Sequence, residues 1–426
     1  MKKALIITYY WPPAGGPGVQ RWLKFVKYLR EFDVEPIVYV PENPHYPIVD
    51  PSFGNEIPEG INILKQRIFE PYQLASLFSK KKTKRISSGI IQSTDQSIVE
   101  KLLLWIRGNL FIPDARKFWV RPSVAYLQEV IEKEGIRTVI TTGPPHSVHL
   151  IGMELKSKND LQWIADFRDP WTSIGYHKKL RLTKGSQVKH RQLESEVLNS
   201  ADCIVVTSKT TKKEFSLITD KPIQVITNGY DGDGKHIEQL DDKFTISHIG
   251  SLLTGRNPES LWQAIKGLTE ENSEFKKKLE LELIGVVSED VLQSIYGHGL
   301  EPYVRLIGYI SHDEAVKKQQ SSQLLLLVEI DSEETQGIIP GKVFEYMKAK
   351  RPILGIGPQN WEVADMIADT NSGKAFSYNE STGIKEQLEV WFKSYQKNEL
   401  HVKSRNIEQY CRRELTGKLA QLIGWE

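Results

Sequence analysis

The chain has 426 residues, of which 39% are hydrophobic and 26% charged, and a formal net charge of +2. This length exceeds one ordinary hydrophobic core and favours two domains. The near-neutral charge gives no reason to expect nucleic acid as a partner. Cys203 and Cys411 are too few for a disulfide framework and fit a reducing compartment. We expect Cys203 to be a core residue of an apolar strand.

The N-terminal sequence MKKALIITYYWPP predicts a buried first strand, because its apolar run is too short for a secretory signal. No stretch approaches the roughly 20 apolar residues that cross a bilayer. We therefore expect a cytoplasmic protein, either without membrane contact or peripheral to the inner face of a membrane.

Short apolar runs alternate with helical patterns along the chain. The first series predicts strands at 4–8, 34–40, 138–142, 163–167, 203–207 and 223–227. From about residue 243 a second series predicts strands at 244–249, 279–286, 304–307, 324–328 and 352–355, with helices at 258–268, 290–295, 311–319 and 342–350. A last helical segment covers 408–423. Strict alternation predicts two α/β domains, each a doubly wound parallel sheet.

Ligands bind such sheets at the carboxyl ends of their strands. The loop after the first strand, YYWPPAGGPGVQRW, carries Gly15 and Gly16 just before a helix start, a place that suits a phosphate. It lacks both the dinucleotide-binding spacing and the G-K-[ST] of a P-loop. The alternative is a tight turn that needs glycines for geometry alone.

Two further loops of the first domain carry polar side chains after a strand. In TTGPPHSVHL, His146 is either a site residue or structural, and we expect His149 to be structural. In WIADFRDPWT, the group Asp166, Arg168 and Asp169 could orient sugar hydroxyls, with Phe167 and Trp171 stacking on ring faces. An internal Arg–Asp pair that holds the loop is the alternative, and both can be true.

The segment VITNGYD ends the first series. Asn228 and Gly229 are a turn signal at the predicted domain junction. Asp231 and Asp233 form a D-x-D pattern, but a linker turn is a poor context for a metal site. We expect no metal ion.

The second domain has two candidate stretches. In HIGSLLTGRNPES, Arg256 precedes a helix, as expected for a diphosphate site. In GIIPGKVFEYMKAKRPIL, Lys342 could contact phosphate or sugar, and Glu345 could accept hydrogen bonds from vicinal hydroxyls such as those of a ribose. Ile338 and Ile339 would place backbone N–H groups against the sugar. The alternative is a solvated helix start.

Five stretches in this order resemble the retaining glycosyltransferases of family 4: Gly15-Gly16, PPHS at 144–147, ADFRDPW at 165–171, NGYD at 228–231 and PGKVFEYMKAKRPIL at 340–354. The resemblance covers essentially the whole chain. It implies the GT-B fold, with two Rossmann-like domains facing across a deep cleft. Residues 1–242 would form the acceptor-side domain and 243–404 the nucleotide-sugar-binding domain, with a terminal helix at about 405–426 packing back on the first.

The resemblance also implies residue roles. Glu345 would bind the donor ribose, Arg256 the diphosphate, and His146 would lie close to the transferred sugar; together with Lys342 they form the candidate catalytic set. Further donor contacts fall on Gly15, Gly16, Asn228, Gly229, Ser251, Gly308, Tyr309, Ile338, Ile339 and Gly341, and acceptor contacts on Arg168, Asp169 and Trp171.

Two positions depart from the family's pattern. Gly337 stands where its first motif glutamate lies, and Ser251 stands where an arginine is frequent, so Lys342 would take over part of the phosphate role. We read both departures as features of members that build bacterial surface polysaccharides.

The implied reaction is retaining transfer of a hexosyl or N-acetylhexosaminyl group. The donor would be a nucleoside diphosphate-sugar, with UDP-sugar as the expected class, and no cofactor is needed. The acceptor would be a hydroxyl of a saccharide or polyprenyl-linked saccharide. One alternative is a nucleotide-sugar 2-epimerase of the same fold, and another is a catalytically silent nucleotide-sugar-binding scaffold.

A basic and aromatic region at 102–121 and a lysine-rich run at 80–85 break the alternation. They predict contact with an anionic membrane surface, which would suit a lipid-linked acceptor. The alternative is that Trp105, Phe111 and Trp119 are core residues and the lysines a solvated loop.

Overall fold

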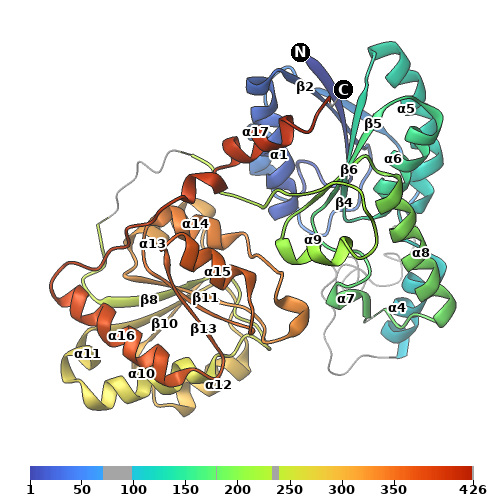
Figure 1. Cartoon of the computed structure of the whole chain (residues 1–426). Helices are drawn as coiled ribbons and strands as arrows, with labels where there is room; N and C mark the ends of the chain where they lie inside the picture. Colours follow the sequence, from blue (N-terminus) through green and yellow to red (C-terminus); the bar gives the residue numbers. More distant parts are fainter. Residues whose placement is uncertain (71–97, 179, 233–238, 425–426) are drawn as a thin grey trace. The chain divides into compact units, whose positions relative to one another are not determined.

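The computed structural model describes residues 1–70, 98–178, 180–232 and 239–424. It divides into two compact units, one of Met1–Asn228 with Arg412–Glu426 and one of Gly229–Cys411 (Figure 1). The sequence placed these boundaries at 242/243 and 404/405. They differ because the backbone around both junctions bonds within the second unit: Tyr230 N–H donates to the Tyr410 carbonyl (3.1 Å), and Lys348 Nζ donates to the Asp231 carbonyl (2.6 Å).

The first unit contains a seven-stranded parallel sheet of order β3-β2-β1-β4-β5-β6-β7. Its strands are β1 (Lys2–Thr8), β2 (Val34–Pro41), β3 (Asn62–Gln66), β4 (Thr138–Gly143), β5 (Gln162–Phe167), β6 (Cys203–Val206) and β7 (Ile223–Val225). Its helices are α1 (Pro17–Leu29), α4 (Ile98–Leu110), α5 (Val120–Glu134), α6 (Ser147–Lys158), α7 (Gly175–Lys178), α8 (Lys184–Ser200), α9 (Lys209–Phe215) and α17 (Arg412–Ala420).

Both faces of this sheet are covered by helices, as the alternation predicted. Residues of β1 point alternately to the two sides: Ile6 packs in the core that includes Trp22 of α1 and Leu419 of α17, and Ile7 packs in the core that includes Val124 of α5. In Figure 1, α17 lies beside α1 although the two are at opposite ends of the sequence. The expectation that Cys203 is buried is confirmed.

The second unit contains a six-stranded parallel sheet of order β10-β9-β8-β11-β12-β13. Its strands are β8 (Phe244–Ile249), β9 (Leu279–Ile284), β10 (Val304–Gly308), β11 (Leu324–Val328), β12 (Ile353–Gly357) and β13 (Gly373–Ser377). Its helices are α10 (Glu259–Glu271), α11 (Ser273–Lys278), α12 (Glu289–Gly297), α13 (His312–Ser321), α14 (Lys342–Ala349), α15 (Glu362–Asp369) and α16 (Ser381–Gln396). The predicted doubly wound α/β fold with two parallel sheets is confirmed.

The region 102–121 divides between core and surface. Trp119 is fully buried, so the core alternative is right for this residue. Trp105 and Phe118 remain 39% and 43% exposed. The lysine-rich run 80–85 lies outside the described residues. Within the described ranges, none of the helices combines the length and the apolar character needed to cross a membrane.

Candidate functional site

Lys342 is the first residue of α14 and reaches back over the end of β8. Its Nζ lies 3.4 Å from Nε2 of His248, a fully buried β8 residue. Gly250, with φ +120°, allows this approach, because a Cβ there would lie 3.1 Å from the same amine. Burial, and next repulsion from Arg256, lower the pKa of Lys342 to about 8, against an opposing attraction to Glu329.

Arg256 is held by a buried carboxylate that sequence analysis did not single out. Its Nη2 donates to Oε1 of Glu329 at 2.8 Å, and the side chain of Glu329 is only 2% exposed. Glu329 directly follows β11, and its Oε1 also accepts from the N–H of Ile330 (2.8 Å). The Arg256 side chain is 30% exposed, so Glu329 anchors it while it remains accessible to solvent. Two cations thus converge near the carboxyl ends of β8 and β11, an arrangement suited to a diphosphate.

Glu345 lies one helical turn after Lys342 and is oriented by its neighbours. Nε2 of Gln319 on α13 donates to its Oε2 (2.9 Å), and Nε2 of His312 lies 4.0 Å from its Oε1. The Glu345 side chain is 29% exposed, so it can still accept hydrogen bonds from a ligand. The ribose role stays a prediction.

The remaining predicted donor contacts of the second unit lie in loops after strands. Tyr309 is 92% exposed and follows Gly308, whose φ of +76° favours glycine. Ile338 does not offer the free N–H that we expected, because that group donates to the Thr335 carbonyl (3.0 Å). Gly229 begins the second unit, Ser251 follows the positive-φ Gly250, and Ile339 and Gly341 precede α14.

In the first unit, Gly15 and Gly16 shape the entry to α1. The N–H of Gly15 donates to the Ile48 carbonyl (3.0 Å), and a Cβ on Gly15 would lie 2.8 Å from the Ile48 side chain. Gly16 is the residue before α1 and has φ +104°, which other residues rarely adopt. No side chain caps this helix start, so its backbone N–H groups suit an anion.

His146 is buried beside Trp171 and has unused hydrogen-bonding capacity. The two rings stack with centroids 4.8 Å apart and planes 3° apart. Neither ring nitrogen of His146 has a partner among the described residues. Burial, and next the neighbouring His149, lower the pKa of His146 well below its usual value, so the ring is neutral. Because buried polar atoms are normally satisfied, these nitrogens point to a ligand or water.

Trp171 is only 1% exposed, and its indole N–H donates to Nδ1 of His190 (3.2 Å). The sugar-stacking role expected for Trp171 and Phe167 does not fit this burial; Trp171 instead supports His146. His149 is structural as expected, since its Nδ1 lies 2.9 Å from the Thr141 hydroxyl. Burial lowers the pKa of His149 to about 3.

In the ADFRDPW segment, Asp166 and Arg168 form internal hydrogen bonds that hold the loop after β5. Asp166 is fully buried and accepts from Nη2 of Arg21 (2.9 Å) and Nε1 of Trp22 (2.8 Å). An internal Arg–Asp pair therefore exists, but its arginine belongs to α1 and not to this loop. Arg168 donates to the carbonyls of Gly143 and Pro144. Burial raises the pKa of Asp169 against the attraction of Arg168. Asn228 is the last residue before the second unit, and the carbonyl of the preceding Thr227 accepts from Nη1 of Arg21 (2.7 Å).

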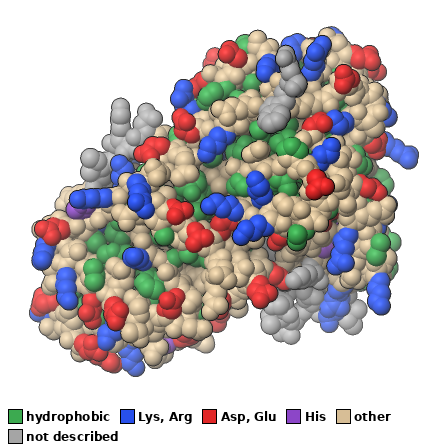
Figure 2. Space-filling view, in the orientation of Figure 1, with side chains coloured by type: hydrophobic (Ala, Val, Ile, Leu, Met, Phe, Trp, Pro, Cys, Tyr) green, Lys and Arg blue, Asp and Glu red, His purple; other side chains and the backbone are tan. Residues whose placement is uncertain are grey.

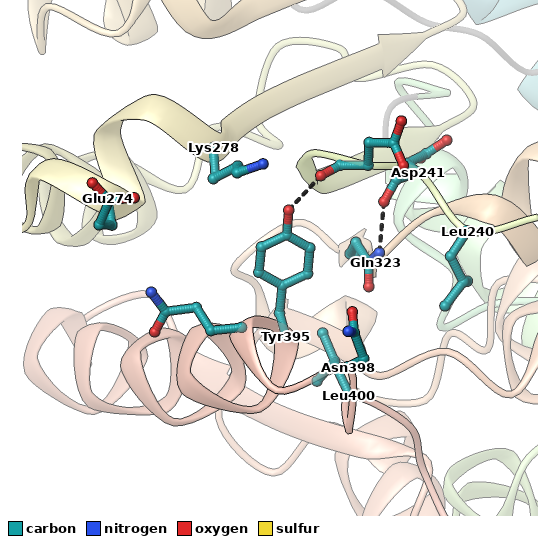
Figure 3. A pocket seen from close by; sticks show the side chains of 10 residues that line it. Leu240, Asp241, Glu274, Lys278, Gln323, Tyr395, Asn398 and Leu400 are labelled. Carbon is teal, nitrogen blue, oxygen red and sulfur yellow. Dashed lines mark hydrogen bonds between the residues drawn. The ribbon is translucent and has the colours of Figure 1, made fainter.

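A pocket of about 480 Å³ lies elsewhere, at the amino ends of the strands of the second sheet (Figure 3). There the Tyr395 hydroxyl donates to the Asp242 carbonyl, and Gln323 donates to the Asp241 carbonyl. The candidate residues of this unit lie at the opposite, carboxyl ends of the strands.

The molecular surface mixes charges of both signs. On the face shown in Figure 2, Lys and Arg side chains lie among Asp and Glu side chains.

No family model matches the chain, and no curated protein matches it in sequence. Its fold, in contrast, is similar to solved structures over nearly the whole length. Anabaena Alr3699/HepE in complex with UDP-glucose is 12% identical, with 99% of each chain covered and a TM-score of 0.57. WaaG, a glycosyltransferase involved in lipopolysaccharide biosynthesis, is 14% identical, covering 99% of this chain and 100% of its own, with a TM-score of 0.53.

A protein described as a UDP-N-acetylglucosamine 2-epimerase, from Listeria monocytogenes, is equally similar in fold. It is 12% identical, covers 99% of this chain and 96% of its own, and has a TM-score of 0.54. Fold similarity therefore extends to proteins of both predicted reaction classes. The chain has the two-domain α/β architecture of the GT-B glycosyltransferases.

Proposed function

We propose that the protein is a retaining glycosyltransferase that moves a sugar from a nucleoside diphosphate-sugar to a hydroxyl acceptor. One observation carries the proposal: Lys342 and Arg256 converge at the carboxyl ends of β8 and β11, and Glu345 lies one helical turn further along α14. The two cations suit a diphosphate and the carboxylate suits a ribose. UDP is the expected nucleotide, and the structural neighbour with bound UDP-glucose supports testing it first.

In this reaction the bond between the sugar's anomeric carbon and the diphosphate oxygen breaks as the acceptor oxygen bonds the same carbon. Negative charge develops on the departing diphosphate, where Lys342 and Arg256 would stabilise it electrostatically. The acceptor hydroxyl loses its proton, which the departing phosphate on the same face can accept. His146 would donate or accept a hydrogen bond at the transferred sugar. No metal ion is needed in this scheme.

The acceptor we propose is a saccharide or lipid-linked saccharide of bacterial surface glycans, with a hexosyl or N-acetylhexosaminyl group transferred. Exposed Trp105 and Phe118 support peripheral membrane contact, since aromatic side chains favour the membrane interface.

The test is calorimetric and thermal-shift binding of UDP, GDP, ADP, CDP and TDP. A ligand that binds only the folded state raises its stability by RT ln(1 + [L]/Kd). We expect one nucleotide to bind preferentially and Arg256→Ala to weaken it. Absence of binding to all five would contradict the proposal and favour a silent scaffold that does not bind nucleotides, with Gly337 and Ser251 as its explanation.

The second candidate is a nucleotide-sugar 2-epimerase, which the epimerase among the structural neighbours favours. An NMR time course with donor and without acceptor separates the two. An epimerase would produce a new nucleotide-sugar, whereas a transferase would release only free sugar and nucleotide by slow hydrolysis.

A further inference from the structure

The amine of Lys342 is fixed from two sides within the second unit. Nε2 of His248 lies 3.4 Å away on β8, and the backbone of Gly250 passes just beyond the end of that strand. The hydroxyl of Tyr346 accepts from the N–H of Ile249 at 3.1 Å, which ties α14 to β8. A lysine side chain normally samples many rotamers, and the contact with His248 restricts them.

The protonation of His248 follows from its other neighbour. Nδ1 lies 3.1 Å from the carbonyl oxygen of Leu326, which can only accept, and Nε2 faces the Lys342 ammonium, which can only donate. A proton on Nδ1 satisfies both contacts, whereas a proton on Nε2, directed to the Ser251 backbone that also hydrogen-bonds this ring, would satisfy neither. His248 is fully buried and close to two cations, and both conditions disfavour a charged ring. Nε2 therefore presents a lone pair toward Lys342.

A neutral imidazole facing Lys342 differs from a carboxylate in its effect on the charge of the amine. A carboxylate facing Lys342 would hold the amine equally well but would cancel its charge. An imidazole lone pair orients the amine and leaves the positive charge available to a ligand. Glu329, the buried carboxylate nearby, is instead engaged by Arg256.

We propose that His248 is a positioning residue for anion binding: its Nε2 lone pair orients the Lys342 ammonium so that its remaining N–H groups bind phosphate oxygens of a diphosphate. This inference rests on the proposed function and adds a residue to its diphosphate site. Sequence patterns did not indicate His248, which lies within an apolar strand.

The pH dependence gives the proposal a specific signature. The charged or titratable groups that act on the Lys342 amine are His248 of β8, Arg256 before α10 and Glu329 after β11. Burial lowers the pKa of Lys342 to about 8, so diphosphate affinity should fall as the pH rises above 8. Because an acceptor favours the protonated amine, loss of His248 should move this fall to lower pH.

The test compares His248→Asn with His248→Gln by calorimetry, using inorganic pyrophosphate and UDP as probes between pH 7 and 9.5. Asparagine places its amide near the position of Nδ1 and keeps the bond to Leu326, whereas glutamine reaches the position of Nε2 and can accept from Lys342. We expect the asparagine variant to bind pyrophosphate about tenfold more weakly, with its pH-dependent fall shifted down, and the glutamine variant to recover most of the affinity. His401→Asn, at an exposed histidine of the same unit, is the matched control.

A double-mutant cycle with Lys342→Met isolates the interaction. If His248 acts through Lys342, His248→Asn should cause no further loss in the methionine background. An equal loss in both backgrounds, or wild-type affinity and pH profile in His248→Asn, would overturn the inference while leaving the proposed function intact. A wild-type protein that binds neither probe would overturn the proposed function itself.

A measurement on the wild-type protein does not depend on how the variants fold. Selective ¹⁵N-histidine labelling reports the tautomer of His248. The signals of this ring are identified as those that disappear in His248→Gln. We expect a neutral ring protonated at Nδ1 across this pH range, with an Nε2 signal that shifts on adding pyrophosphate. A ring protonated at Nε2, or one indifferent to pyrophosphate, would contradict the proposal.

Discussion

Glu345 and Lys342 occupy the same helix but are proposed to recognise different parts of one ligand. Glu345 is partly exposed and oriented by Gln319, while Lys342 is held by His248. Binding of a nucleoside diphosphate should depend on both residues. Binding of pyrophosphate, which has no ribose, should depend only on the lysine.

Replacing Glu345 with alanine should therefore weaken UDP binding about tenfold, because a hydrogen bond to a charged group contributes about 1.5–3 kcal/mol. Pyrophosphate binding should not change. Calorimetry with both ligands checks this, and Glu386→Ala on the exposed side of α16 is the control. Wild-type UDP affinity in Glu345→Ala would rule out the ribose role.

His146 allows a test that preserves packing. Phenylalanine at this position keeps a ring stacked on Trp171 but removes both nitrogens, neither of which has a partner among the described residues. If a substrate uses these nitrogens, His146→Phe should lower the rate of sugar transfer by about 10- to 100-fold with little change in thermal stability.

The measurement is release of nucleoside diphosphate from the donor that the wild type accepts. Full activity in His146→Phe would assign the histidine a purely structural role. Lower activity accompanied by a large loss of stability would show that the stack with Trp171 had been disturbed, and would not count in favour of a substrate contact.

At the scale of elements, α4 and the turn after it present apolar side chains to solvent. Leu102, Trp105 and Phe118 are 56%, 39% and 43% exposed, and Nζ of Lys117 lies 5.4 Å from the ring centre of Phe118. Exposed aromatic side chains next to a lysine suit an anionic membrane interface.

Changing Trp105 and Phe118 together to serine should reduce binding to phosphatidylglycerol vesicles by at least about tenfold, because serine has no aromatic surface to bury in the membrane interface. Co-sedimentation measures the vesicle binding. Leu217→Ser removes an 89% exposed leucine of the same unit and should have no effect. Equal vesicle binding by the double variant and the wild type would contradict the membrane role.

Most strands that the sequence predicted are buried on both faces and rich in valine, isoleucine and leucine. The predicted strands β7 and β10 are exceptions, since both are edge strands with exposed residues. The two that it missed, β3 and β13, are at sheet edges and consist mainly of half-buried or exposed residues. Their sequences, NILKQ and GKAFS, lack the apolar run that distinguishes a strand from a loop.

The candidate site was predictable to the extent that it follows strand ends. Arg256, Lys342 and Glu345 lie in or after such loops, where parallel sheets bind ligands. Glu329 carries the same signal, a carboxylate directly after an apolar strand. His248 and the Arg21–Asp166 pair could not be predicted in this way, because a polar residue within a buried segment gives no indication of a partner far away in sequence.

At the scale of the whole molecule, the two ends of the chain contribute to the same core. Leu415, Leu419 and Ile423 are buried with residues of β1 and α1, so the first unit is complete only after the second has been synthesised. The second unit is one continuous segment with its own core, which includes Leu388 of α16.

This arrangement predicts that the two cores can be weakened separately. Leu419→Ala should destabilise the first unit by about 2–5 kcal/mol, through lost burial and a cavity, and Leu388→Ala should do the same in the second.

Hydrogen exchange measured on individual peptides distinguishes the two units. Each substitution should speed exchange in its own unit and leave exchange in the other unit near the wild-type rate. Because α17 is distant in sequence from the strands that it covers, faster exchange in β1 and α1 of Leu419→Ala would demonstrate that the terminal helix stabilises the first unit. Uniform acceleration across both units would instead mean that the two cores unfold as one.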